Sequence, residues 1–122
     1  MPAKSIRAFK TAWFAKAAKK ARISDDALSR ALRETQLGQA DDLGGGVFKK
    51  RLNDNMHRSL ILAKGSRYWV YAFLFAKKDR ANITVDELAG FRKLADVYAR
   101  MTTAEANTAI GNGDLLEIFD DH

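Results

Sequence analysis

The sequence predicts an α+β fold, with an antiparallel sheet of four to five strands, an N-terminal helical hairpin and C-terminal helices. Side chains in the middle of the chain alternate with the two-residue period of strands, whereas the segments on either side show helical spacing. The helical segments also begin at residues that cap helices well. At 122 residues, of which 47% are hydrophobic, the chain can bury one core and is predicted to form a single domain over residues 1–122.

The N-terminal part is predicted to hold a short edge strand and the helical hairpin. Residues 4–9 alternate polar and apolar side chains, as a short edge strand does. From Thr11 the apolar spacing becomes helical, and Ser24 is suited to cap a second helix that ends at Gly38. Trp13 and Phe14 are expected to anchor the hairpin on the sheet, although a groove beside them could also accept a helix of a partner protein.

Three consecutive strands are predicted in the middle of the chain, over residues 47–52, 58–63 and 68–77. The third is almost continuously apolar and aromatic, which is typical of a central strand buried on both faces. In the first strand, the two-residue period puts Lys49 and Arg51 on one face and Lys50 on the other. The glycines at 44–46 are expected to allow a flexible entry into this strand or a close approach of the backbone. We do not expect them to cradle a phosphate, because no helix N-terminus follows them.

The C-terminal third is predicted to contain two helices and a last strand. Thr84 with Glu87, and Thr102 with Glu105, have the spacing of capping boxes. Leucine and aromatic residues after the first box continue at helical spacing. Residues 115–119 can then add a short strand to an edge of the sheet.

Positive charge is concentrated on the three middle strands. The whole chain carries +6, but residues 43–80 hold nine Lys and Arg against two Asp, and residues 81–122 carry −5. Such a charge on a sheet indicates a polyanionic partner, either nucleic acid or the ribosome. The plainer alternative is that the charges are segregated only for solubility.

Composition also excludes several kinds of site. The chain has no cysteine, so it can form neither a disulfide nor a thiolate metal site, and its two histidines make a histidine-rich metal site improbable. The longest apolar stretch is too short to span a bilayer, and the N-terminus lacks the apolar core of a signal peptide. We therefore expect no membrane association and a cytoplasmic location.

Four segments together resemble a known family. They are TAWFAKAAKKARISDDAL, DLGGGVFKKRL, HRSL and YAFLFAKKDRANIT, and their order and spacing are similar to those of the RelE/HigB-type toxins of bacterial type II toxin-antitoxin modules, in the RelE/ParE superfamily. The resemblance implies a RelE-like microbial RNase-type fold and cleavage of mRNA in the ribosomal A site, with no metal or other cofactor. It also implies a cognate antitoxin, commonly a helix-turn-helix protein, through which alone the toxin reaches operator DNA.

Metal-free RNA cleavage uses the 2′-hydroxyl of the substrate as nucleophile, so the protein must move protons and stabilise a dianionic phosphorane. Within a cluster of like charges the pKa of a lysine falls, whereas arginine stays charged and clamps phosphate oxygens. The resemblance implies that Arg58 contacts the scissile phosphate. It suggests as further catalytic residues Lys78, Lys49 and Lys50, and as RNA-binding residues Arg51, Lys77, Arg80 and His57.

The chain departs from the family at two places. The subgroup usually has a Gly-Gly turn before the arginine of the middle strand, and here the turn is formed by residues 55–57. Some relatives carry a tyrosine just after the last basic run, where this chain has Thr84 as a predicted helix cap. His57 is the side chain whose ordinary pKa suits acid-base chemistry. However, adjacent residues of a strand point to opposite faces, so we favour a turn histidine without a catalytic role over a partner of Arg58. The basic residues of the first helix either contact ribosomal RNA or form a solvated face.

Two other functions remain open at this level. One is a toxin of the same fold that acts by binding, as ParE-like inhibitors of DNA gyrase do. The other is a non-catalytic RNA-binding module. Several basic residues converging on one groove would favour the nuclease over both.

Overall fold

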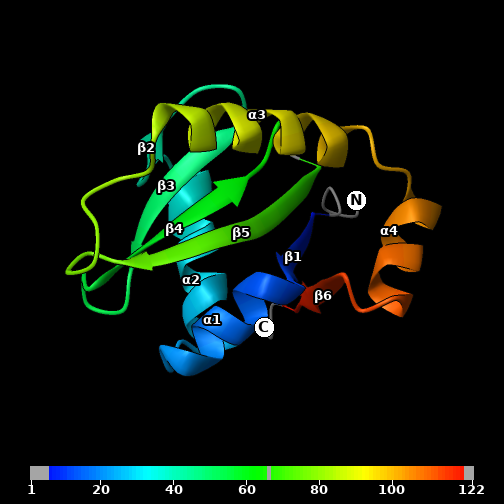
Figure 1. The fold of residues 1–122 in the computed structure, drawn as a ribbon. Helices are drawn as coiled ribbons and strands as arrows, with labels where there is room; N and C mark the ends of the chain where they lie inside the picture. The colour runs from blue at the N-terminus through cyan, green and yellow to red at the C-terminus, as the bar shows by residue number, and fades with distance from the viewer. Residues whose placement is uncertain (1–5, 66, 120–122) are drawn as a thin grey trace.

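The computed structural model describes residues 6–65 and 67–119, which form a sheet of six strands with helices on both faces (Figure 1). The elements follow along the chain as β1 (Arg7–Thr11), α1 (Ala12–Lys20), α2 (Asp25–Gln36), β2 (Asp41–Asp42), β3 (Val47–Leu52), β4 (His57–Leu62), β5 (Tyr68–Ala76), α3 (Val85–Ala99), α4 (Thr103–Gly111) and β6 (Leu115–Ile118). Across the sheet their order is β2-β3-β4-β5-β1-β6. The fold is therefore α+β, and β5 is a central strand as predicted.

The sheet corrects the prediction of four to five antiparallel strands. It is mixed, because β1 pairs with β5 in parallel while the other neighbouring pairs are antiparallel. β1 is also not an edge strand, since it lies between β5 and β6. Its partner is about sixty residues away, so no local pattern reveals the pairing. The first residues of the predicted strand, 4 and 5, lie outside the described residues.

A second correction concerns the edge opposite β6. The additional strand there is β2, which has only two residues and pairs with β3 through Asp41 and Asp42. A segment of two residues is too short to show a two-residue period. Its acidic side chains are also unusual in strands, which explains why the sequence did not predict it.

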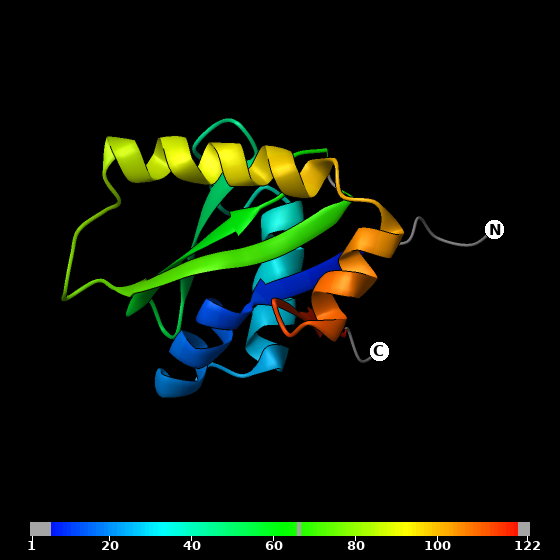
Figure 2. The same ribbon diagram turned by 45° about the vertical axis from the view of Figure 1, so that its right-hand side comes forward.

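The N-terminal helices cover one face of the sheet together but do not pack as a simple hairpin (Figures 1 and 2). Phe14 of α1 and Leu28 of α2 are fully buried in a core that both helices share with the strands. However, α1 contacts mainly β5, whereas α2 contacts β3 and β6. The helices are therefore spread across the sheet. Phe14 anchors α1 as predicted, but Trp13 is 52% exposed.

The helices α3 and α4 begin at the predicted capping boxes. The Thr84 hydroxyl accepts a hydrogen bond from the Glu87 backbone at 3.0 Å, and the Glu87 carboxylate accepts one from the Thr84 backbone at 2.7 Å. Thr102 and Glu105 repeat the arrangement at 3.1 and 2.8 Å. Figure 2 shows α3 along the face of the sheet opposite α1 and α2. The capping boxes thus determine where the chain turns back over this face.

The glycine segment before β3 is a place of close approach. A Cβ atom on Gly46 would lie 2.5 Å from the Lys64 Cβ, and one on Gly45 would lie 2.7 Å from Cγ of Arg92. The Arg92 guanidinium donates hydrogen bonds to the carbonyls of Leu43 and Gly44. The glycines therefore let α3 bind the chain directly at the start of β3, which confirms the structural interpretation of this motif.

Candidate functional site

Three of the predicted cations lie on the same face of the sheet. Arg51 of β3 is directly opposite Arg58 of β4, and Arg58 is directly opposite Phe75 of β5. Directly opposed residues of antiparallel strands point to one face, with Cβ atoms about 4.5–5.5 Å apart. Lys49 shares this face because it precedes Arg51 by two residues. We call Lys49, Arg51 and Arg58 the basic face.

The basic face lies beside α3 but is not covered by it. Val47, on the same face of β3, is fully buried in the core that includes Ala95 of α3. Four residues further along the same strand, Arg51 is exposed. α3 therefore covers the beginning of β3 and leaves its end open to a ligand.

Arg80 joins the basic face from the loop between β5 and α3. Its guanidinium carbon lies 5.6 Å from the ring centre of Phe75, the residue opposite Arg58, and 5.9 Å from that of Phe73. The side chain donates to the Asn82 carbonyl at 3.0 Å and makes a two-pronged ion pair with Glu87. Arg80 is thus held over the end of β5 by the first turn of α3.

The electrostatics divide these arginines into two kinds. The hydrogen bond from Arg80, followed by the one from the Thr84 backbone, lowers the pKa of Glu87 to about 2, and the same Glu87 bond raises the pKa of Arg80. The charge of Arg80 is therefore largely matched. Among the described residues, by contrast, neither Arg51 nor Arg58 forms an ion pair. Their charges are available to a polyanion.

Arg58 is nevertheless held in a definite orientation. Its guanidinium Nη1 donates to the carbonyl of Asn55 at 3.0 Å and to that of His57 at 3.2 Å. The Asn55 carbonyl belongs to the turn before β4, where Asn53, Asp54 and Asn55 all have positive φ, and His57 is the first residue of β4. Asn and Asp tolerate this conformation better than other residues with side chains, so the turn sequence positions the arginine.

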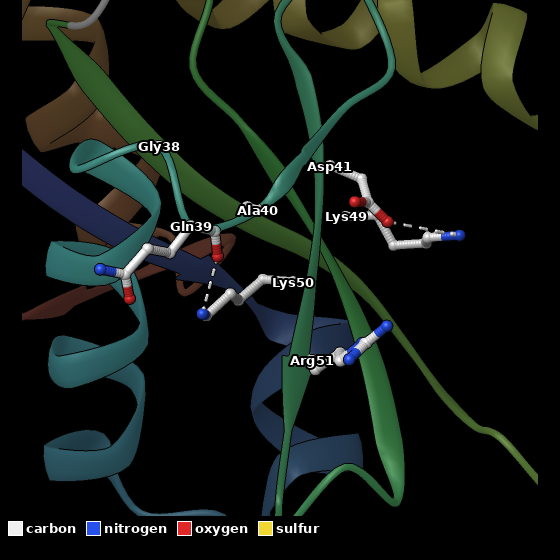
Figure 3. Close-up of a pocket in the computed structure, with 7 residues that line it drawn as sticks. All are labelled: Gly38, Gln39, Ala40, Asp41, Lys49, Lys50 and Arg51. Atoms are coloured by element: carbon white, nitrogen blue, oxygen red, sulfur yellow. Dashed lines mark hydrogen bonds and ion pairs between the residues drawn. The ribbon is translucent and has the colours of Figure 1, made fainter.

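Lys50 lies on the opposite face of β3. Its Nζ donates to the Gln39 carbonyl at 2.8 Å and forms an ion pair with Glu34 of α2 at 2.9 Å. Figure 3 shows Lys50 on one side of the strand, with Lys49 and Arg51 on the other. These residues line a cavity of about 390 Å³ beside β2. Lys49 and Arg51 therefore share the face of Arg58, whereas Lys50 lies on the other face of the sheet.

Lys49 faces a single carboxylate across the strand pair. Its Nζ is 3.9 Å from Oδ2 of Asp41, the residue opposite it on β2 (Figure 3). Since 69% of the Asp41 side chain is exposed, the contact is weak and easily exchanged for another anion.

His57, Lys77 and Lys78 are also not on the basic face. His57 is opposite Leu52 and Ala76 in the sheet, on the side of α1, and its Nδ1 lies 3.2 Å from Nδ2 of Asn53. Lys77 and Lys78 line a cavity with His57 on that same side. Of the last basic run, it is Arg80 and not Lys78 that lies over Phe75, the residue opposite Arg58.

In the described structure, neither Thr84 nor Tyr71 offers its hydroxyl to the basic face. Thr84 uses its hydroxyl in the cap of α3. Tyr71 is fully buried and donates to the Leu28 carbonyl at 2.7 Å, and its burial raises the pKa of its hydroxyl well above the usual range. The Tyr71 hydroxyl therefore serves the core and not the basic face.

One functional contact was missed by sequence reasoning. Glu87 was expected only as a capping residue, and its partner Arg80 lies seven positions earlier in the chain. The two residues share no element, so no helical or strand period links them. The available signal was the pair of acidic residues Asp86 and Glu87 at the start of a helix that follows a basic run.

The family model described as the RelE toxin of the RelE/RelB toxin-antitoxin system matches residues 6–118. The chain belongs to this family. It is thus a toxin of a toxin-antitoxin system, and an antitoxin is its partner. No curated protein and no solved structure matches this RelE-family toxin significantly. Among the described helices, none combines the length and the apolar character needed to cross a membrane.

Proposed function

We propose that this RelE-family toxin is a ribosome-dependent mRNA endoribonuclease that inhibits translation in the cytoplasm. The observation that supports this most is the convergence of Lys49, Arg51 and Arg58 on one open face, with Arg80 at its margin. A phosphate bound there meets two arginines whose charges are not matched by carboxylates in the described structure. We expect a helix-turn-helix antitoxin to neutralise it and to link it to operator DNA.

The proposed reaction transfers the phosphate within the RNA. The 2′-oxygen attacks the adjacent phosphorus, the bond to the 5′-oxygen breaks, and the products are a 2′,3′-cyclic phosphate and a 5′-hydroxyl. Arg58 and Arg51 bind the non-bridging oxygens and stabilise the charge that builds up in the phosphorane. A guanidinium group has no proton to give up in proteins, so these side chains act as clamps and do not carry protons.

We assign proton transfer to Lys49. Of the three side chains that make up the basic face, it is the one ammonium group, which can give up a proton, whereas the other two are guanidinium groups. In the proposed step its ammonium protonates the leaving 5′-oxygen, while the 2′-hydroxyl proton passes to water. Lys49 then regains its proton from solvent. Arg80 supports the departing nucleotide from the loop before α3.

The test is cleavage of a defined mRNA on programmed ribosomes, with mapping of new 5′ ends. We expect wild-type protein to produce ends at the A-site codon, and Arg58→Ala to lose most of this activity. Lys49→Arg keeps the charge but removes the transferable proton, so it should bind ribosomes and cleave slowly. The matched control is Lys50→Gln, one residue away on the opposite face, which should cleave as wild type does.

Two outcomes would contradict this proposal in different ways. If the wild type arrests growth but produces no new ends, the protein is a toxin that acts by binding and not a nuclease. If Arg58→Ala cleaves normally, or Lys50→Gln fails as Arg58→Ala does, then the nuclease site is not the basic face.

A further inference from the structure

A second hollow lies on the other side of the sheet from the basic face. Two adjoining cavities of about 420 and 450 Å³ run between α1 and the ends of β4 and β5. Both are lined by Lys20, Ala21, His57, Ala76 and Lys78. Because they share these walls, they form one groove, which we call the α1 groove. Its lining does not include Arg51 or Arg58, so it is distinct from the basic face.

One end of the α1 groove carries an exposed and well-supported aromatic ring. Trp13 is 52% exposed, although its ring is stacked on Phe73 with centroids 5.0 Å apart and planes at 24°. Phe73 is in turn packed against Phe91 of α3 at 5.5 Å. The indole therefore has one face fixed on the protein and much of its surface free. Such a ring is suited to stack a nucleobase, and base stacking does not depend on the sequence of the nucleic acid.

The charges around the α1 groove favour binding of a nucleic-acid backbone beside the Trp13 ring. Three lysines line it, Lys20, Lys77 and Lys78, against two acids, Asp54 and Asp79. Within the described chain none of these lysines forms an ion pair. An exposed aromatic ring together with unmatched cations is the combination that binds single-stranded nucleic acid.

The groove is continuous with the basic face around the edge of β5. The pairing of β5 with β1 ends at Tyr71, so beyond that residue β5 has a neighbour only in β4 among the described strands. Phe75 lines the α1 groove, and Arg80 lies over its ring. The Phe75 ring therefore lies between the α1 groove and Arg80, on a part of β5 that no second described strand covers.

We propose that the α1 groove binds the single-stranded RNA segment next to the cleaved phosphate, with a base stacked on Trp13 and phosphates held by Lys20 and Lys78. This inference rests on the proposed endoribonuclease function, since it extends the same RNA beyond the basic face. It explains why an indole stays exposed at the edge of the sheet. It also gives Lys78 a role on the side of the molecule where the structure places it.

The test is fluorescence titration with an octanucleotide whose 2′-hydroxyls are methylated, so that it can bind but cannot be cleaved. The chain has two tryptophans, and Trp69 is only 6% exposed, so quenching by stacked bases reports on Trp13. At low salt we expect saturable quenching. Variants at Trp13 lack this reporter, so their binding is measured by the fluorescence anisotropy of an end-labelled octanucleotide. Trp13→Leu, which keeps apolar cover over Phe73, should weaken binding about tenfold, while Trp13→Phe should retain most of it.

Lys20→Gln provides an independent measurement that does not alter the aromatic packing. Loss of one phosphate contact should reduce the slope of log K against log salt concentration by about 0.7. The matched control is Lys16→Gln, on the same helix but outside the lining of the groove, which should leave the slope unchanged.

The inference is overturned if the octanucleotide does not bind at low salt, or binds without quenching. It is also overturned if Trp13→Leu and Lys20→Gln bind RNA as the wild type does. Should these variants instead weaken only the complex with the antitoxin, the groove is a docking surface for protein. Quenching without any cleavage of mRNA by the wild type would retain the groove as an RNA site and refute only the proposed function.

Discussion

Replacing Gly46 by alanine tests how the glycine segment works. Gly46 has φ of +84°, and an added Cβ would lie 2.5 Å from the Cβ and 2.8 Å from the backbone of Lys64. Gly65 has the same φ of +84°, but its added Cβ would meet nothing within 4 Å. The left-handed conformation alone costs an alanine about 1–2 kcal/mol. Because Gly65→Ala has this cost too, the difference between the two variants isolates the steric overlap.

Forcing a methyl group into a packed position costs about 1–3 kcal/mol. Gly46→Ala should therefore be less stable than Gly65→Ala by that amount. For a domain of this size, the difference corresponds to about 4–12 °C in Tm. The assay is thermal unfolding followed by circular dichroism, together with denaturant midpoints for the free energy of unfolding. Equal stabilities for the two variants would refute the close-approach interpretation, and loss of RNA binding without loss of stability would support a phosphate cradle instead.

Three further predictions concern the basic face, the ion pair of Arg80 with Glu87, and the buried hydroxyl of Tyr71. Arg58→Ala should reduce single-turnover cleavage on ribosomes about 10²–10³-fold, as loss of one donor to a developing oxyanion does, whereas Lys50→Gln should change it less than threefold, within about 0.6 kcal/mol. The pKa of Glu87 is lowered to about 2 from 4.5, so its contribution to stability is complete above pH 4.5 and is lost as the pH falls toward 2. Unfolding of Glu87→Gln should accordingly depend less on pH than the wild type across this window, and equal slopes would contradict the pairing with Arg80. Tyr71→Phe should cost about 0.5–1.5 kcal/mol in denaturant unfolding, because it removes the buried hydrogen bond to the Leu28 carbonyl, and should not alter cleavage by correctly folded protein.

Much of the fold was predictable because its signals are local. The capping box of Thr84 and Glu87 depends on residues three positions apart, and the strand containing Lys49 and Arg51 shows its period within six residues. The parallel pairing of β1 with β5 was not predictable, because its energy comes from contacts between distant segments. Local patterns describe an element but not its neighbour in the sheet.

The candidate site was likewise predictable only in part. Strand parity in the sequence already separated Lys50 from Lys49 and Arg51. Which of these two faces carries Arg58 depends on the register between β3 and β4, where a slip of one residue would exchange the faces. The register between β3 and β4 depends on tertiary packing, because it is set by which side of each strand is buried under α3.

By itself, the sequence determined the secondary structure of the middle strands, the starts of the C-terminal helices and the positive charge that indicates a polyanionic partner. Only the tertiary structure decided that Arg58 joins Lys49 and Arg51, and that Arg80 rather than Lys78 lies beside them. The reason is physical. Charge and period belong to single segments, whereas an active face exists only when separate strands and a loop, each held by its own packing, bring their side chains to the same place.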